Sequence, residues 1–242
     1  TIKQALNSGT LAAGCAQKLA GRLSWATQFM FFKLGRAMIR PIFDQKRSRN
    51  GDVKIGSPLW IALKWWCRVL SLELCELHEW SVAERPVAHL FVDAAGNPAR
   101  CAAVLYLEGR WMYTDGKPSA ALMDRLIKRS DSQIMALETM AIALGLSTFE
   151  QELEERSVIV YSDNKGAEAS TRKGTAKSWD HCELIHEIWT HAAVNKIRVW
   201  VERVPTDDNI SDLPSRFEYD MLNELGAVWR APGISKMMLE DI

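Results

Sequence analysis

The sequence predicts an α/β fold, with a mixed five-stranded sheet flanked by helices and an additional N-terminal helical segment. Two observations indicate this fold. Apolar residues recur at three- and four-residue steps in residues 1–80, as in amphipathic helices. From Pro86 onward, short apolar runs alternate with helical stretches in the order β-β-β-α-β-α-α-β-α. The chain has 48% hydrophobic residues and 8 prolines among 242 residues, so it can bury a substantial core.

The N-terminal segment is expected to contain two main helices. Apolar residues from Leu11 to Met30 line one face of the first helix, and Pro41 is expected to close that pattern. A polar, basic stretch at residues 44–51 resembles a loop. The second helix is expected to begin after Ser57, a suitable N-cap, and its tryptophans are interpreted as core residues rather than as a stacking platform for nucleic acid.

The rest of the chain is expected to form three strands in an antiparallel meander, followed by alternating helices and strands. The boundary signals divide the sequence into a helical segment at 1–80, an α/β domain at 86–225 and a C-terminal tail at 226–242. The expected strands are 87–93, 101–107, 111–114, 156–162 and 196–204, and the expected helices are 132–144, 163–171, 179–194 and 212–225.

Net charge is unevenly distributed along the chain. The totals are 30 Lys and Arg against 30 Asp and Glu, but residues 1–80 hold 12 against 5, a balance of +7 that leaves −7 for the remainder. This division predicts a basic face and an acidic site in different parts of the protein.

Several protein classes can be excluded from the sequence. The longest uncharged stretch near the N-terminus, residues 23–32, spans ten residues, and a membrane helix needs about 20. Five scattered cysteines without a Cys-x-x-Cys pair predict neither disulfides nor a zinc knuckle. We therefore expect an intracellular protein, cytoplasmic or nuclear, with no membrane partner. The first residue is Thr1 rather than Met, so we expect a fragment or a processed product of a longer protein.

Four acidic residues occupy positions that packing explains poorly: Asp93, Glu138, Asp163 and Asp212. Taken singly, Asp163 and Asp212 could be helix caps and Asp93 a turn residue. A cluster of buried carboxylates, however, needs bound cations to offset its repulsion. Ligands that are all oxygen favour Mg²⁺ or Mn²⁺, and two such ions suit in-line displacement at a phosphodiester.

Local motifs around these acids resemble the ribonuclease H fold of retroelements. The motifs are residues 90–96 (LFVDAAG), 138–144 (ETMAIAL), 161–164 (YSDN) and 209–216 (NISDLPSR). Residues 163–174 are similar to a segment of DIRS-like, tyrosine-recombinase retrotransposons, and the resemblance covers residues 86–225. Residues 1–80 resemble the thumb or connection region of the corresponding reverse transcriptases, particularly at 18–25 and 35–41.

The resemblance implies endonucleolytic cleavage of the RNA strand of an RNA/DNA hybrid by two Mg²⁺ or Mn²⁺ ions. Asp93 would bridge both ions, Asp212 would complete the one that activates water, and Glu138 and Asp163 would hold the other. The polymerase part (fingers and palm) of a reverse transcriptase is the implied protein partner. Candidate contacts to the DNA backbone, whose basic members could equally be a solvated face, are Asn164, Lys165, Arg172, Lys173, Gly174, Thr175 and Lys177.

One departure from the family pattern concerns the loop before the last aspartate. Many ribonucleases H carry a histidine there, but no histidine lies between Val201 and Asp212, so Glu202 or Arg203 would have to substitute.

Two other functions remain open. The domain could be a non-catalytic module that positions nucleic acid or scaffolds a polymerase, or another nuclease of the same fold, such as an integrase or resolvase, against which Glu138 argues.

Overall fold

The computed structural model describes residues 1–48, 50–71, 86–131 and 133–233. Contacts divide the chain into two compact units. Unit 1 comprises Thr1–Val82 and Gly174–Trp189, and unit 2 comprises Ala83–Lys173 and Thr190–Ile242. The expected boundary between residues 80 and 86, and the end of the expected tail at 234–242, fall largely outside the described residues.

Unit 1 consists of short helices around an apolar centre. Trp66 is fully buried there, and its Nε1 donates a hydrogen bond to the Met38 carbonyl oxygen at 3.3 Å. Ser57 caps its helix as the sequence predicts, because its Oγ accepts from the Trp60 backbone N–H. The helices are α1 (Ile2–Ser8), α2 (Ala13–Ala26), η1 (Ala37–Ile39), α3 (Arg40–Gln45), α4 (Pro58–Val69) and the first part of α9 (Trp179–Val194).

The structure corrects the expected role of Pro41. The first long helix, α2, already ends at Ala26, and turns precede η1. Pro41 lies in the first turn of α3 instead of closing a helix. Proline fits this position because the first N–H groups of a helix have no intrahelical acceptor. Trp60 and Trp65 are half-buried, so only part of the tryptophan set in α4 belongs to the core.

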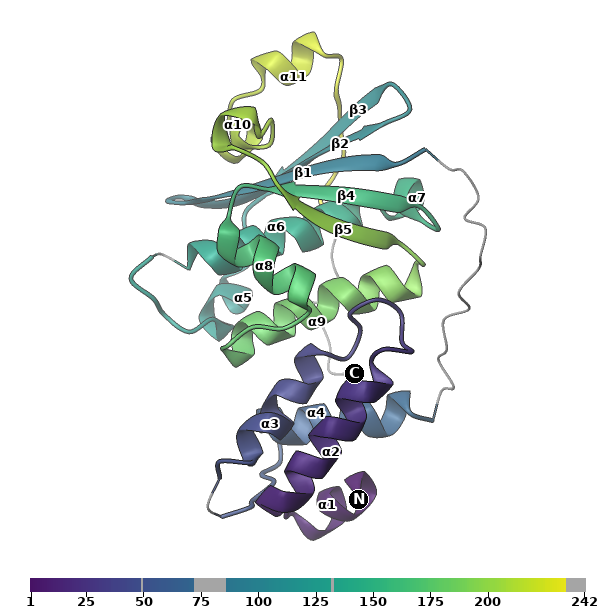
Figure 1. Cartoon of the computed structure of the whole chain (residues 1–242). Helices are drawn as coiled ribbons and strands as arrows, with labels where there is room; N and C mark the ends of the chain where they lie inside the picture. The colour runs from purple at the N-terminus through teal and green to yellow at the C-terminus, as the bar shows by residue number, and fades with distance from the viewer. Residues whose placement is uncertain (49, 72–85, 132, 234–242) are drawn as a thin grey trace. The chain divides into compact units, whose positions relative to one another are not determined.

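Unit 2 contains a mixed sheet with the strand order β5-β4-β1-β2-β3-β6 (Figure 1). Strands β1, β2 and β3 form an antiparallel meander, and β4, β5 and β6 each pair with a parallel neighbour. The α/β class is therefore confirmed. The strands are β1 (Ala88–Gly96), β2 (Ala99–Leu107), β3 (Arg110–Gly116), β4 (Ser157–Ser162), β5 (Arg198–Arg203) and β6 (Val228–Trp229).

The sheet has six strands where five are expected, because part of the expected tail pairs with β3. Side chains hold this sixth strand in place. Asp115 on β3 accepts hydrogen bonds from Trp229 Nε1 at 3.3 Å and from the Tyr219 hydroxyl at 3.1 Å, and it forms an ion pair with Arg100 on β2. We call these four residues the Asp115 clasp. Such long-range contacts leave no periodic signal in a two-residue strand.

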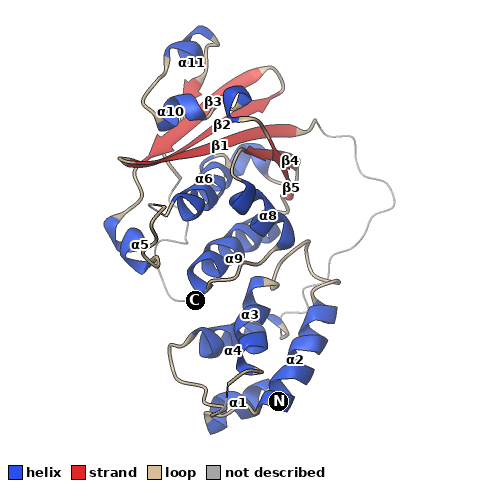
Figure 2. Ribbon diagram, turned by 60° about the vertical axis from the view of Figure 1, so that its left-hand side comes forward, coloured by secondary structure: helices blue, strands red, loops and turns tan. Residues whose placement is uncertain are grey.

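Helices cover both faces of the sheet. On one face, α6 (Ile134–Thr148) packs against β1 and β2, and α8 (Lys165–Lys173) packs against β5 (Figure 2). On the other face, α10 (Asp212–Ser215) contacts β1 and β2. The further short helices of unit 2 among the described residues are α5 (Ala120–Arg125), α7 (Glu150–Leu153), the 3-10 helix η2 (Thr206–Asp208) and α11 (Asp220–Glu224).

The final predicted helix, 212–225, is two helices in the structure. Phe217 has φ 66°, in the left-handed region, which breaks the helical path between α10 and α11. The break leaves Arg216 at the end of α10, one turn from Asp212. This short helix places Asp212, Ser215 and Arg216 on one side of the sheet at β1.

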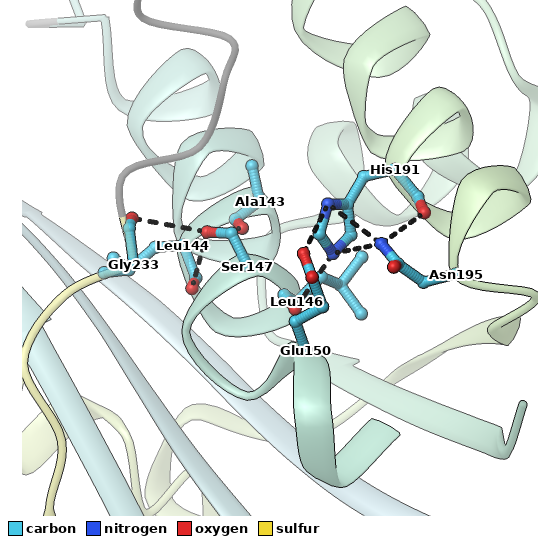
Figure 3. Close-up of polar contacts among 8 residues, drawn as sticks. All are labelled: Ala143, Leu144, Leu146, Ser147, Glu150, His191, Asn195 and Gly233. Carbon is cyan, nitrogen blue, oxygen red and sulfur yellow. Dashed lines mark hydrogen bonds and ion pairs between the residues drawn. The ribbon is translucent and has the colours of Figure 1, made fainter. Parts of the chain in front are cut away.

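The C-terminal end of α6 is held by neighbouring segments of unit 2 (Figure 3). His191 Nε2 lies 3.1 Å from the Leu146 carbonyl oxygen, and Ser147 Oγ donates to the carbonyl oxygens of Ala143 and Gly233 at 2.8 and 3.4 Å. These contacts fix the helix that carries Glu138. In the described part of the chain, no helix combines the length and apolar character needed to span a bilayer.

Candidate metal centre

Three carboxylates from three elements of unit 2 meet at one point. Asp93 lies on β1, Glu138 on α6, and Asp163 directly follows β4. Each offers one oxygen, and these oxygens lie within 4.8 Å of one another. We call these residues the three-acid group. It contains three of the four acids that the sequence singles out.

The backbone explains why these side chains converge. β1 continues to Gly96, so Asp93 is a buried strand residue, paired with Ala102 on β2, rather than part of a turn. β4 runs parallel to β1, so Asp163 emerges at the same sheet edge. The cap of α8 is Asn164, whose Oδ1 accepts from the backbone N–H groups of Gly166 and Ala167 at 2.9 and 3.0 Å. Asp163 is therefore free of the capping role.

Each carboxylate of the three-acid group accepts a specific hydrogen bond. Ser215 Oγ donates to Asp93 Oδ2 at 2.6 Å, and Thr206 Oγ1 donates to Asp163 Oδ2 at 2.7 Å. The Ala94 backbone N–H donates to the Glu138 carboxylate. Glu138 Oε2 is buried without a hydrogen-bond partner. The donors thus orient the carboxylates, and Glu138 keeps one buried oxygen without a protein partner.

The electrostatics of the group are unfavourable for three negative charges. Burial, together with the charges of Asp163 and Asp212 and against the opposing Ser215 hydrogen bond, raises the pKa of Asp93 to about 6. Burial, followed by the charges of Asp93 and Asp163, raises the pKa of Glu138 to about 9. A bound cation would reverse both shifts, because it favours the charged form of each carboxylate.

The donor set fits a hard divalent cation. All three ligands are carboxylates, the donors that Mg²⁺ and Mn²⁺ prefer, and Glu138 presents an oxygen that lacks a protein partner. No histidine or cysteine joins this group among the described residues. His186 instead packs edge-on against Trp65 within unit 1, where burial lowers its pKa to about 4.

Asp212, the fourth acid, lies outside the three-acid group and has a cation of its own. It begins α10, and Arg216 places Nε and a terminal guanidinium nitrogen 2.9 and 2.8 Å from Asp212 Oδ1. Its charge still raises the pKa of both Asp93 and Glu138. Asp212 is therefore an electrostatic neighbour of the group, paired with arginine.

The candidate nucleic-acid contacts of unit 2 differ in their surroundings. Asn164 is occupied as the helix cap. Arg172 lies 2.7 Å from Glu168 and also stacks over the Trp200 ring at 5.0 Å, so it is already engaged. Lys165 and Lys173 are exposed.

The remaining candidate contacts belong to unit 1. Gly174 is buried with φ 76°, and an added Cβ would lie 2.7 Å from the Lys33 Cβ, so its role is steric. Thr175 Oγ1 lies 3.7 Å from Cys182 Sγ. Lys177 is exposed and lines a pocket of about 450 Å³ together with Arg40 and Lys54.

Sequence reasoning missed the side chains that hold the acids in place. Ser215 and Arg216 belong to the quoted motif at 209–216, yet nothing in the sequence indicates which acid each contacts. Thr206 carries no signal at all, since its contact with Asp163 spans 43 positions. Asn209 anchors the same loop by donating to the Val92 carbonyl oxygen at 3.0 Å. Glu202, one suggested substitute for the missing histidine, accepts a hydrogen bond from Trp200 Nε1 at 2.9 Å.

Comparisons with known proteins find likeness in structure but not in sequence. The sequence matches no family model, and no curated protein is significantly similar to it. A solved structure of the N-terminal RNase H domain of a Mycobacterium tuberculosis protein, fused to maltose-binding protein, is similar over 59% of this chain and 97% of that chain, with 18% identity and a TM-score of 0.38. What characterises the site is its own residues: three oriented carboxylates with oxygens left for a cation.

Proposed function

We propose that unit 2 hydrolyses the RNA strand of RNA/DNA hybrids at a two-metal site, as a ribonuclease H. The observation that carries the proposal is the three-acid group, in which Asp93, Glu138 and Asp163 approach within 4.8 Å and Glu138 has a buried oxygen without a partner. Among the residues that the structure describes, no Lys or Arg side chain forms an ion pair with these three acids, so a bound cation would be the partner of their charged forms.

The residues have distinct roles in this proposal. Glu138 and Asp163 hold one divalent cation, Asp212 holds the other, and Asp93 contributes to both. When bound, such cations lower the pKa of an attacking water and stabilise charge on the leaving oxygen. Ser215 and Thr206 keep Asp93 and Asp163 in orientation, so the acids need no rearrangement to act.

The proposed biological setting is a retroelement reverse transcriptase. It rests on the sequence resemblance of residues 86–225 and, for the thumb or connection region, of residues 1–80. In this setting unit 1 contributes a basic surface that contacts hybrid phosphates, and the polymerase part is the partner. Lys165 and Lys173 remain proposed contacts from unit 2, since both are exposed.

Cleavage of a labelled RNA/DNA hybrid by the purified chain, in Mg²⁺ and separately in Mn²⁺, tests the proposal. We expect the RNA strand to be cut, and Asp93→Asn and Asp163→Asn each to reduce the rate at least about 100-fold, because each removes a cation ligand. Asp124→Asn, which changes an exposed acid on α5, is the matched control and should cleave like the wild type.

Two outcomes would contradict the nuclease proposal. Equal cleavage by the wild type and both site variants would mean that a contaminant cuts the hybrid. Hybrid binding without cleavage in either metal would favour the alternative, a non-catalytic module that positions nucleic acid or scaffolds a polymerase.

A further inference from the structure

Arg216 gives the two sides of the proposed site different electrostatic surroundings. The three-acid group has no protein cation in contact among the described residues, whereas Asp212 has the Arg216 guanidinium. Arg216 Nε and one terminal guanidinium nitrogen lie 2.9 and 2.8 Å from Asp212 Oδ1. The charge of Arg216 also lowers the pKa of Asp93. In the absence of metal, the Arg216 guanidinium thus balances the negative charge of Asp212.

The three-acid group and the Arg216–Asp212 pair also differ in how firmly their side chains are held. Ser215 and Thr206 fix Asp93 and Asp163 through short hydrogen bonds, and Asp93 and Glu138 are buried. The Arg216 and Asp212 side chains are 60% and 24% exposed, respectively. An ion pair this exposed is weak, because water solvates the released guanidinium. The pair can therefore open at low cost, while the three-acid group is already assembled.

We propose that Arg216 makes the two cation positions fill in order: the three-acid group binds first, and the second cation binds only after displacing Arg216 from Asp212. This inference rests on the proposed two-metal function. Arg216 acts here as a positioning residue, because it affects the site through Asp212. Two cations of the same kind would then bind with different affinities, and the weaker affinity would depend on residue 216.

Titration of the full chain with Mn²⁺, counted as free ion by electron paramagnetic resonance, tests this without nucleic acid. The wild type should bind one Mn²⁺ at least about tenfold more tightly than the second. Arg216→Gln should tighten the second binding by about fivefold, the fold-change that corresponds to the loss of a competing exposed ion pair, and should change the first less than twofold.

Two further variants sharpen the test. Arg216→Lys keeps a positive charge near Asp212 but loses the two-nitrogen contact, so it should fall between the wild type and the glutamine variant. Arg230→Gln is the matched control, since Arg230 forms a similarly exposed ion pair with Glu152, 3.2 Å long and outside the acidic site. It should bind both ions like the wild type.

The possible failures are distinguishable. If both ions bind the wild type with equal affinity, or if Arg216→Gln leaves the second binding unchanged, the ordered filling is wrong while hybrid cleavage can still be observed. If the wild type binds no Mn²⁺ and cleaves no hybrid, the metal centre and the proposed function fail together.

Discussion

Burial disfavours the charged form of Glu138, and this makes the stability of the protein depend on pH. Its pKa is about 9 in the folded protein, above the ordinary value of about 4.5, chiefly because of burial. Between these two pH values the folded state retains a proton that the unfolded state releases. The stability of the cation-free protein should therefore fall as the pH rises from about 4.5 to 9.

Glu138→Gln should remove that pH dependence. In the presence of a chelator at pH 8, we expect the variant to melt about 4 °C above the wild type, because the wild-type carboxyl must take up a proton on folding at this pH and the amide need not. Added Mg²⁺ should raise the melting temperature of the wild type but not that of the variant, which lacks a ligand. Thermal unfolding followed by circular dichroism measures both effects, with Glu224→Gln, an exposed change on α11, as the control. A lower melting temperature for Glu138→Gln under chelation would contradict the raised pKa of Glu138 in the folded protein.

At the scale of elements, the packing of α6 on the sheet positions Glu138. Gly145 makes the close approach possible, since an added Cβ would lie 3.0 Å from the Ala103 Cβ and 3.0 Å from a Leu90 methyl carbon. Both neighbours belong to buried strand residues and have little room to move. The glycine therefore sets the distance between α6 and the strands that carry Asp93.

Gly145→Ala should destabilise the protein by about 1–3 kcal/mol, because overpacking exceeds the usual gain in helix propensity. Gly21→Ala in α2 is the control. Its Cβ would meet nothing within 4 Å, so the same substitution should be neutral or stabilising by up to about 1 kcal/mol. Urea denaturation of both variants compares the two free energies of unfolding, and equal values would show that α6 is not closely packed at this point.

At the scale of elements, the sequence patterns predicted the long helices and the main strands better than the short elements. Periodicity predicted α9 with its observed bounds, Trp179–Val194, and placed the four acids on or next to their observed elements. It did not predict α5, α7 or β6, because such short elements depend on contacts with distant segments. The orientation of the carboxylates could not be predicted from the sequence either, because the hydrogen bond from Ser215 to Asp93 joins residues 122 positions apart. Chemistry at a site is thus readable from residue types, while its geometry depends on the tertiary fold.

At the scale of the whole molecule, the +7 balance of residues 1–80 predicts a phosphate-binding surface in unit 1. The exposed side of α2 shows one concrete form of it. Lys18 and Arg22 are exposed one turn apart, and Trp25, 64% exposed, follows on the same helix and contacts Phe29. Exposed cations beside exposed aromatic rings suit contact with a nucleic-acid strand.

Replacing both Lys18 and Arg22 by alanine should weaken hybrid binding and lower the slope of log affinity against log salt by about 2, one for each lost phosphate contact. The measurement is fluorescence anisotropy with a labelled hybrid at several salt concentrations, in an Asp93→Asn background that prevents cleavage. Lys196→Ala removes a cation paired with Glu155 at 2.7 Å and should leave the slope unchanged. An unaltered slope in the double variant would assign the basic charge of α2 to a role other than hybrid binding.

The Asp115 clasp lies beside the pairing of β3 with β6, near one edge of the sheet. A sheet edge with unpaired N–H and C=O groups is a template for pairing with another molecule. At the β3 edge, β6 pairs with Met112 and Tyr113, and Tyr219 and Trp229 donate hydrogen bonds to Asp115 beside this pairing. A proteolytic cut anywhere between α11 and β6 would expose that edge and deprive a buried carboxylate of the Trp229 donor. A short strand near the end of the described chain thus covers part of the β3 edge.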